Sequence, residues 1–119
     1  MAEFSHIRVD QRDEITVVQL LDSHLVDRFS LIELHDELAS LIDESRPHRL
    51  LLGFGYVRKF GSEAVNVLLR IHETIKSQDG QVHICDVPNG VREVFKILRL
   101  DGTVFHIAGT MAEGLESFG

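Results

Sequence analysis

The hydroxyl group of Ser62 is the side chain whose position most clearly favours chemistry. It stands in a Gly-Ser-Glu-Ala sequence at residues 61–64, after an apolar run at residues 49–54 and at the start of helical periodicity at residues 62–77. Backbone N–H groups at a helix start are unpaired and the helix dipole is positive there, so a phosphate or another anion is stabilised. On periodicity alone, the commoner role of such a serine is to cap the helix.

Motifs for nucleophilic catalysis and nucleotide binding do not fit the chain. A nucleophile elbow needs glycine two residues after the serine, where Ala64 stands. Gly53 and Gly55 lack the third glycine of a dinucleotide-binding loop, and no Gly-Lys-Ser/Thr follows them. A serine triad assembled from distant residues stays open, but no motif indicates one. We therefore expect no catalytic residue and no bound cofactor.

The residues that commonly bind metals are scattered. Cys85 is the only cysteine, so the chain has no intramolecular disulfide and no thiolate cluster, and its apolar neighbours predict a buried thiol. No histidine belongs to an H-E-x-x-H motif or to an i, i+4 pair on one helix. We therefore expect no metal site. The seven histidines, which fall on separate predicted elements, are His6, His24, His35, His48, His72, His83 and His106.

Composition restricts the class of protein. With 119 residues and 44% hydrophobic residues, the chain predicts a single soluble domain over residues 1–119. A formal net charge of -7 argues against nucleic acid as a partner, because phosphate binding needs a basic face. No apolar run approaches the roughly 20 residues that cross a bilayer, and the N-terminus does not resemble a secretory signal. We expect a cytoplasmic protein without a membrane partner.

Hydrophobic periodicity predicts alternating strands and helices after an N-terminal hairpin. This order implies parallel strands joined by right-handed crossovers, and hence an α/β fold. Asp27 or Ser30 is expected to cap the first helix, the latter with Glu33 as a capping box, and Thr110 with Glu113 to cap the last. The expected strands are residues 5–10, 15–21, 49–54, 81–85 and 103–107, and the expected helices are residues 28–44, 62–77, 88–98 and 110–118.

From the second helix onward the chain resembles a known family. The carriers are the strand 50–54 followed by residues 62–69, the strand 80–85 after a glycine turn, and the helix at 91–101. Their order and spacing resemble the STAS family, the domain of bacterial anti-sigma factor antagonists, over roughly residues 7–118. The resemblance implies a mixed, mostly parallel β-sheet with an N-terminal hairpin and about four α-helices packed mainly on one side.

The family also suggests a role for the serine at the start of the second helix. Its loop typically reads Asp-Ser-Ser-Gly or Asp-Ser-Ala-Gly, and the first serine is phosphorylated by an anti-sigma factor that is also a serine kinase. Ser62 matches that serine, whereas Gly61 replaces the aspartate, Glu63 the next serine or alanine, and Ala64 the glycine. The resemblance therefore implies phosphorylation at Ser62 and partner binding by Gly61, Ser62, Glu63 and Asn66.

These inferences lead to an anti-sigma factor antagonist that acts by partner switching. The expected partner is an anti-sigma factor with serine kinase activity, and the chain itself is expected to be a monomer or a weak dimer. One alternative is a STAS-like scaffold without phosphorylation, which Gly61 and Glu63 favour. A nucleotide-binding STAS module and a small hydrolase are the others.

Overall fold

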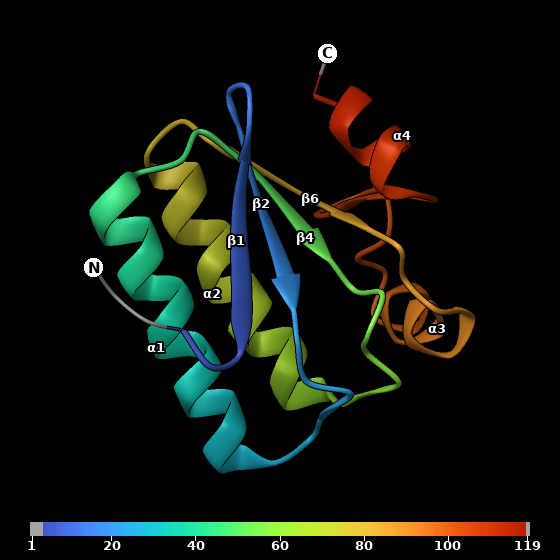
Figure 1. Ribbon diagram of the computed structural model, residues 1–119. Helices are drawn as coiled ribbons and strands as arrows, with labels where there is room; N and C mark the ends of the chain where they lie inside the picture. The colour runs from blue at the N-terminus through green and yellow to red at the C-terminus, as the bar shows by residue number, and fades with distance from the viewer. Residues whose placement is uncertain (1–3, 119) are drawn as a thin grey trace.

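The centre of the molecule is a five-stranded sheet with the strand order β1-β2-β4-β6-β7 (Figure 1). The computed structural model describes residues 4–118. β1 (Ile7–Arg12) and β2 (Ile15–Leu20) form the predicted antiparallel hairpin. The strands β2, β4 (Arg49–Gly53), β6 (Gln81–Cys85) and β7 (His106–Ala108) run parallel to one another. The predicted mixed, mostly parallel sheet is therefore confirmed.

The helices divide between the two faces of this sheet. The two long helices, α1 (Arg28–Ser45) and α2 (Ser62–Ser77), lie side by side on one face (Figure 1). The short helix α4 (Met111–Glu116) packs against β4, β6 and β7 on the opposite face. α3 (Asn89–Ile97) lies to the side of the sheet, in contact with a short strand described below. The α/β architecture with four helices is thus confirmed, with α4 alone on the second face.

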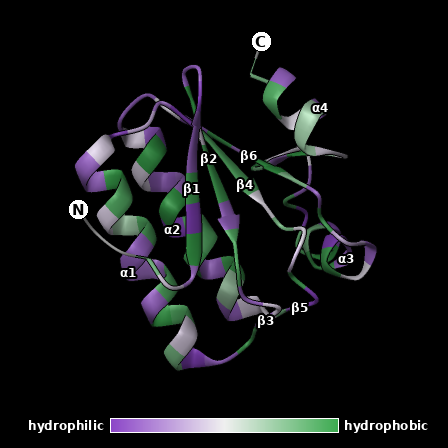
Figure 2. Ribbon diagram, in the orientation of Figure 1, coloured by the Kyte–Doolittle hydropathy of each residue, from purple (hydrophilic) through white to green (hydrophobic). Residues whose placement is uncertain are grey.

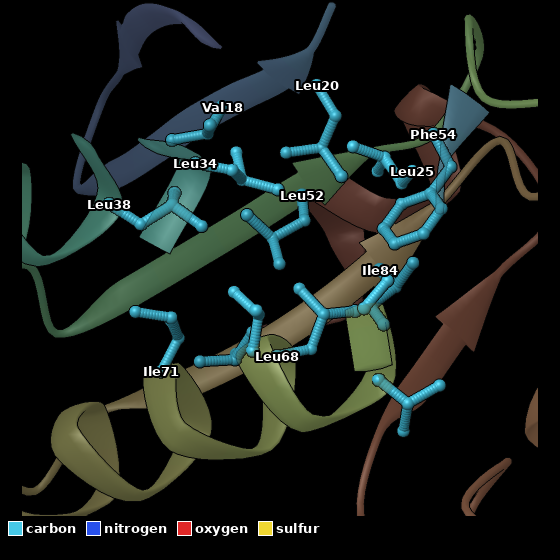
Figure 3. Close-up of a cluster of buried hydrophobic side chains, with 14 of the residues drawn as sticks. Val18, Leu20, Leu25, Leu34, Leu38, Leu52, Phe54, Leu68, Ile71 and Ile84 are labelled. Atoms are coloured by element: carbon cyan, nitrogen blue, oxygen red, sulfur yellow. The ribbon is translucent and has the colours of Figure 1, made fainter. Parts of the chain in front are cut away.

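Strand alternation explains why the molecule has two apolar layers. Successive side chains of a strand point to opposite faces, so Leu50 and Leu52 belong to the core under α1 and α2, whereas Leu51 belongs to the cluster under α4. Hydrophobic residues accordingly fill the inner strands, and polar residues mark the outward sides of the long helices (Figure 2). The side chains that meet in the main core are shown in Figure 3 and include Val18, Leu34, Leu38, Leu52, Leu68 and Ile71.

The single cysteine lies in the smaller layer. Cys85 is fully buried, as predicted, and its thiol lies 3.9 Å from the sulfur of Met111. Burial, together with the neighbouring charge of Asp86, raises the pKa of this thiol to about 12. A thiol in this state is a packing group and a poor nucleophile.

Two short strands escaped prediction. β3 (His24–Leu25) and β5 (Lys59–Phe60) pair in parallel and form a separate two-stranded sheet. Two residues are too few to show a period of two, and the pairing joins segments 35 residues apart, so no local pattern reports it. The pair matters because β3 precedes α1 and β5 precedes α2.

The last strand begins later than predicted. Residues 103–107 were expected to form it, but β7 begins at His106. The N–H groups of Val104 and Phe105 both donate to the carbonyl oxygen of Leu100, and Gly102 has a φ of 79°. Residues 102–104 therefore form a turn, and Phe105, which makes an isolated bridge to Asp101, is completely buried in the main core. The apolar character of Phe105 reflects this burial.

The helix caps separate the alternatives that the sequence left open. The side chain of Asp27 accepts a hydrogen bond of 2.9 Å from the N–H of Ser30, so Asp27 is the N-cap and Ser30 lies inside α1. Thr110 caps α4 as predicted, accepting a bond of 3.1 Å from the N–H of Glu113. The first strand was expected at residues 5–10 but begins at Ile7 and runs to Arg12.

Candidate functional site

Ser62 is the first residue of α2, as the sequence predicted. The N-cap is Gly61, with an extended backbone (φ -95°, ψ 173°), and no side chain caps this helix. The expected structural alternative, a Ser62 side chain acting as the cap, is therefore wrong. Ser62 and Glu63 are both exposed. The hydroxyl of Ser62 thus lies at a positively polarised helix start and is accessible from solvent.

The segment before Ser62 is held from two sides. The N–H of Phe54 donates to Cys85 O (3.0 Å), which ties the end of β4 to β6. Farther along, the N–H of Arg58 donates to Ser23 O (2.7 Å) and the N–H of Gly61 donates to Leu25 O (3.3 Å). These backbone bonds fix the start of α2 beside the segment that leads into α1.

Aromatic packing also holds the segment before Ser62 in place. Phe54 and Phe60 make an edge-on contact with ring centroids 5.4 Å apart, and Phe60 stacks on Phe95 of α3 at the same distance. Phe54 and Phe95 are fully buried and Phe60 nearly so. Because Phe60 is only two residues before Ser62, this buried cluster leaves the start of α2 little freedom to move.

A groove runs between α1 and α2 next to Ser62. We call it the α1–α2 groove, and it has a volume of about 470 Å³. Of the four predicted partner-binding residues, Glu63 and Asn66 line it, while Gly61 and Ser62 occupy the start of α2 beside them. Its lining residues are Arg28, Leu31, Ile32, His35, Glu63, Asn66, Val67 and Arg70.

Sequence reasoning missed three exposed apolar side chains, of which Ile32 lines this groove. Val26, Phe29 and Ile32 are 52%, 71% and 52% exposed. Val26 lies close to the predicted site, because its Cγ1 atom is 3.7 Å from the position that a Cβ atom would take at Gly61. A signal was present in the sequence: Phe29 and Ile32 fall outside the buried stripe of α1, which is Leu31, Leu34, Leu38, Leu41 and Ile42.

Several histidines pack against other rings or form hydrogen bonds. Within residues 4–118, no group of three or more His, Cys, Asp or Glu residues is arranged to hold a metal ion. Burial and the neighbouring His106 lower the pKa of His83 to about 4, and its ring stacks on Phe118 at 4.0 Å. For His6, burial acts against the charged form, but hydrogen bonds with Asp22 (2.6 Å) and Glu33 outweigh it and raise the pKa.

Residues 4–118 contain no helix that is both long and apolar enough to span a membrane.

Comparisons with known proteins agree with the resemblance seen in the sequence. A family model described as the STAS domain matches residues 6–114. No curated protein matches the chain.

Solved structures with the same fold match nearly the whole chain. An anti-sigma-factor antagonist (STAS) domain protein from Planctomyces limnophilus is 20% identical with a TM-score of 0.81, covering 95% of this chain and 98% of that one. A variant of RsbS from Moorella thermoacetica is 18% identical, with a TM-score of 0.77 and coverage of 95% and 94%. SpoIIAA from Bacillus in its phosphorylated form is 16% identical, with a TM-score of 0.70 and coverage of 95% and 99%. At these identities the likeness is one of fold.

Proposed function

The chain belongs to the STAS domain family, and on that premise we propose that it is an anti-sigma factor antagonist that works by partner switching. In the unmodified state, the surface formed by Gly61, Ser62, Glu63 and Asn66 binds an anti-sigma factor that is also a serine kinase. The bound anti-sigma factor then releases its sigma factor. Phosphorylation of Ser62 reverses this binding. The protein acts by binding, not by catalysis.

The observation that carries the proposal is the exposed Ser62 hydroxyl at the first residue of a long helix whose N-cap is a glycine. A kinase can reach this hydroxyl without unfolding the helix. A phosphate there accepts hydrogen bonds from the free N–H groups of the first turn and interacts favourably with the helix dipole. The modification therefore leaves the fold intact and changes only the surface.

Repulsion explains how one phosphate would oppose binding. The group adds about -1.5 to -2 charges, and it stands next to the exposed carboxylate of Glu63. A binding surface that has to exclude water from both groups is destabilised by their desolvation and their mutual repulsion. Release of the partner follows from charge alone, without a change of backbone conformation.

A structural relative supports the transfer of this role to Ser62. SpoIIAA has been solved in a phosphorylated and in an unphosphorylated form, and the two match this chain with TM-scores of 0.70 and 0.76. Space at Gly61, the first departure from the usual loop, can be judged from its neighbours. At Gly61 an added Cβ atom would meet Val26 at an ordinary contact distance, so glycine is not required there by space.

The test is phosphorylation by serine-kinase anti-sigma factors of the organism that encodes the chain, each purified singly and supplied with ATP. We expect one of them to modify Ser62, as detected by phosphopeptide mass spectrometry, and to leave the Ser62→Ala variant unmodified. Ser62→Asp should bind that partner at least about 10-fold more weakly than Ser62→Ala. An unmodified Ser62, together with equal affinities of the two variants, contradicts partner switching.

A second candidate function is a constitutive scaffold that is never phosphorylated. The exposed Glu63 favours it, because this carboxylate already places negative charge beside the serine. Phosphopeptide mass spectrometry of the protein from its own cells separates the two candidates. A scaffold shows no modified Ser62 under any growth condition.

A further inference from the structure

We propose that the α1–α2 groove binds a helix of the partner protein that presents an apolar side chain next to an acidic one. The proposal rests on the proposed function and adds to it the place and the chemistry of the contact. It assigns binding roles to Phe29, Ile32, Arg28 and Arg70, which lie outside the usual phosphorylation loop.

The apolar part of the contact is supplied by α1 and the segment before it. Phe29 and Ile32 are three residues apart and therefore lie on the same side of the helix, more than half exposed. Ile32 lines the groove, and Val26 lies beside Gly61 at the start of α2. Exposed apolar side chains beside a groove are typical of a protein-binding surface. A partner helix inserts apolar side chains into such a groove at helical spacing.

The charged part of the contact selects an acidic partner. Arg28 and Arg70 line the groove, and Glu63 is the one acidic residue in the lining. Neither arginine forms an ion pair with another residue between positions 4 and 118. With two arginines and one glutamate, the lining has a charge opposite in sign to the formal charge of -7 of the whole chain. Charge complementarity therefore favours a carboxylate on the incoming helix.

The position of the groove links this contact to Ser62. Glu63, which follows Ser62 directly, is part of the groove lining. A phosphate on Ser62 adds negative charge at this end of the groove and weakens its attraction for an acidic side chain. The same modification that creates repulsion at the start of α2 therefore lowers the affinity of the groove for the partner.

The experiment measures binding of each purified serine-kinase anti-sigma factor to three variants by isothermal titration calorimetry. The Phe29→Ser/Ile32→Ser variant removes the two exposed apolar side chains of α1. The Arg28→Glu/Arg70→Glu variant reverses the charge of the two arginines in the groove lining. Ile97→Ser is the matched control, because Ile97 is 75% exposed on α3, outside the groove. Far-ultraviolet circular dichroism checks that each variant remains folded.

We expect both groove variants to bind at least about 10-fold more weakly than the wild type and the control to bind within about twofold of it. The wild-type affinity should fall with added salt, and the arginine variant should lose that dependence. If both groove variants bind as tightly as the wild type, the proposal is overturned while the proposed function stays in place. Absence of binding by the wild-type chain to every anti-sigma factor contradicts the proposed function itself.

Sedimentation velocity distinguishes a partner helix from a second copy of this chain. We expect the wild type and the Phe29→Ser/Ile32→Ser variant to have the same oligomeric state. A wild-type dimer that this substitution converts to a monomer would assign the groove to a second copy and overturn the proposal.

Discussion

At the scale of single residues, the distinctive feature is that a glycine stands where the family has aspartate. Gly61 has an ordinary extended backbone and caps α2 without a side-chain hydrogen bond. A side chain at this position would point towards Val26 at 3.7 Å, which is van der Waals contact. Neither backbone strain nor lack of space excludes a side chain at this position.

This interpretation predicts that Gly61→Asp is tolerated. Aspartate is a better N-cap than glycine by a few tenths of a kcal/mol, so the free energy of unfolding should rise slightly. Gly61→Ala is the matched control, since alanine fills similar space without a capping oxygen, and it should be less stable than Gly61→Asp. Urea denaturation measures both. A loss of more than about 1 kcal/mol in Gly61→Asp would show that the site rejects a side chain.

At the scale of elements, the site depends on two helix starts that are brought together by β3 and β5. Their pairing places the segment before α1 against the segment before α2. Each helix contributes a different property: α2 contributes Ser62 at its first residue, while α1 contributes the exposed Phe29 and Ile32. The groove therefore requires that the first turn of α1 is well formed.

The cap of α1 gives a prediction at this scale. Asp27→Ala removes the side chain that accepts the hydrogen bond from Ser30 N, and it should lower the free energy of unfolding by about 1 kcal/mol. Ser30→Ala is the control, because Ser30 lies inside the helix and its change should be within about 0.5 kcal/mol of zero. Thermal or urea denaturation compares the two. Equal losses would mean that Ser30 also contributes a capping bond.

At the scale of the whole molecule, His83 helps to attach the end of α4 to the second face of the sheet. The ring of His83 stacks on Phe118, and its Nδ1 lies 2.6 Å from the Ser117 hydroxyl oxygen. Since that hydroxyl donates to Gly114 O, the Nδ1–H of His83 donates to Ser117. His83 therefore joins β6 to the end of α4 in its neutral form, which agrees with its lowered pKa.

Acidic pH should destabilise the packing of His83 against the end of α4. The folded-state pKa of His83 is about 4 against an ordinary value of 6.5, so below pH 6.5 the unfolded chain binds a proton that the folded chain does not. The free energy of unfolding therefore falls as pH decreases from about 6.5 to about 4. At lower pH the loss due to His83 stays constant, at about 1 to 3 kcal/mol. The lowered pKa of His72 acts in the same direction, and the raised pKa of His6 acts in the opposite one.

The His83→Gln variant isolates this effect. The difference in unfolding free energy between the wild type and the variant, measured by urea denaturation from about pH 4 to about pH 8, should shrink towards acid pH. Other titrating groups are common to both proteins and cancel in this difference. Parallel stability curves would show that His83 is not the residue responsible.

The sequence by itself determined the order of the main elements, the two long helices and the position of Ser62 at a helix start. Those features follow from local periodicity and from residue preferences at helix ends, which act over a few neighbouring residues. The role proposed for Ser62 came from the resemblance to the STAS family. Local patterns alone favoured a helix cap as the role of this serine.

Only the tertiary structure decided what surrounds that serine. The β3–β5 pairing, the α1–α2 groove and the exposure of Phe29 and Ile32 all depend on segments distant in sequence. The turn at residues 102–104 likewise accompanies the burial of Phe105, which no local strand pattern reveals. Ser62 could be found from periodicity because a helix start is local, whereas a binding groove exists only after two helices pack together.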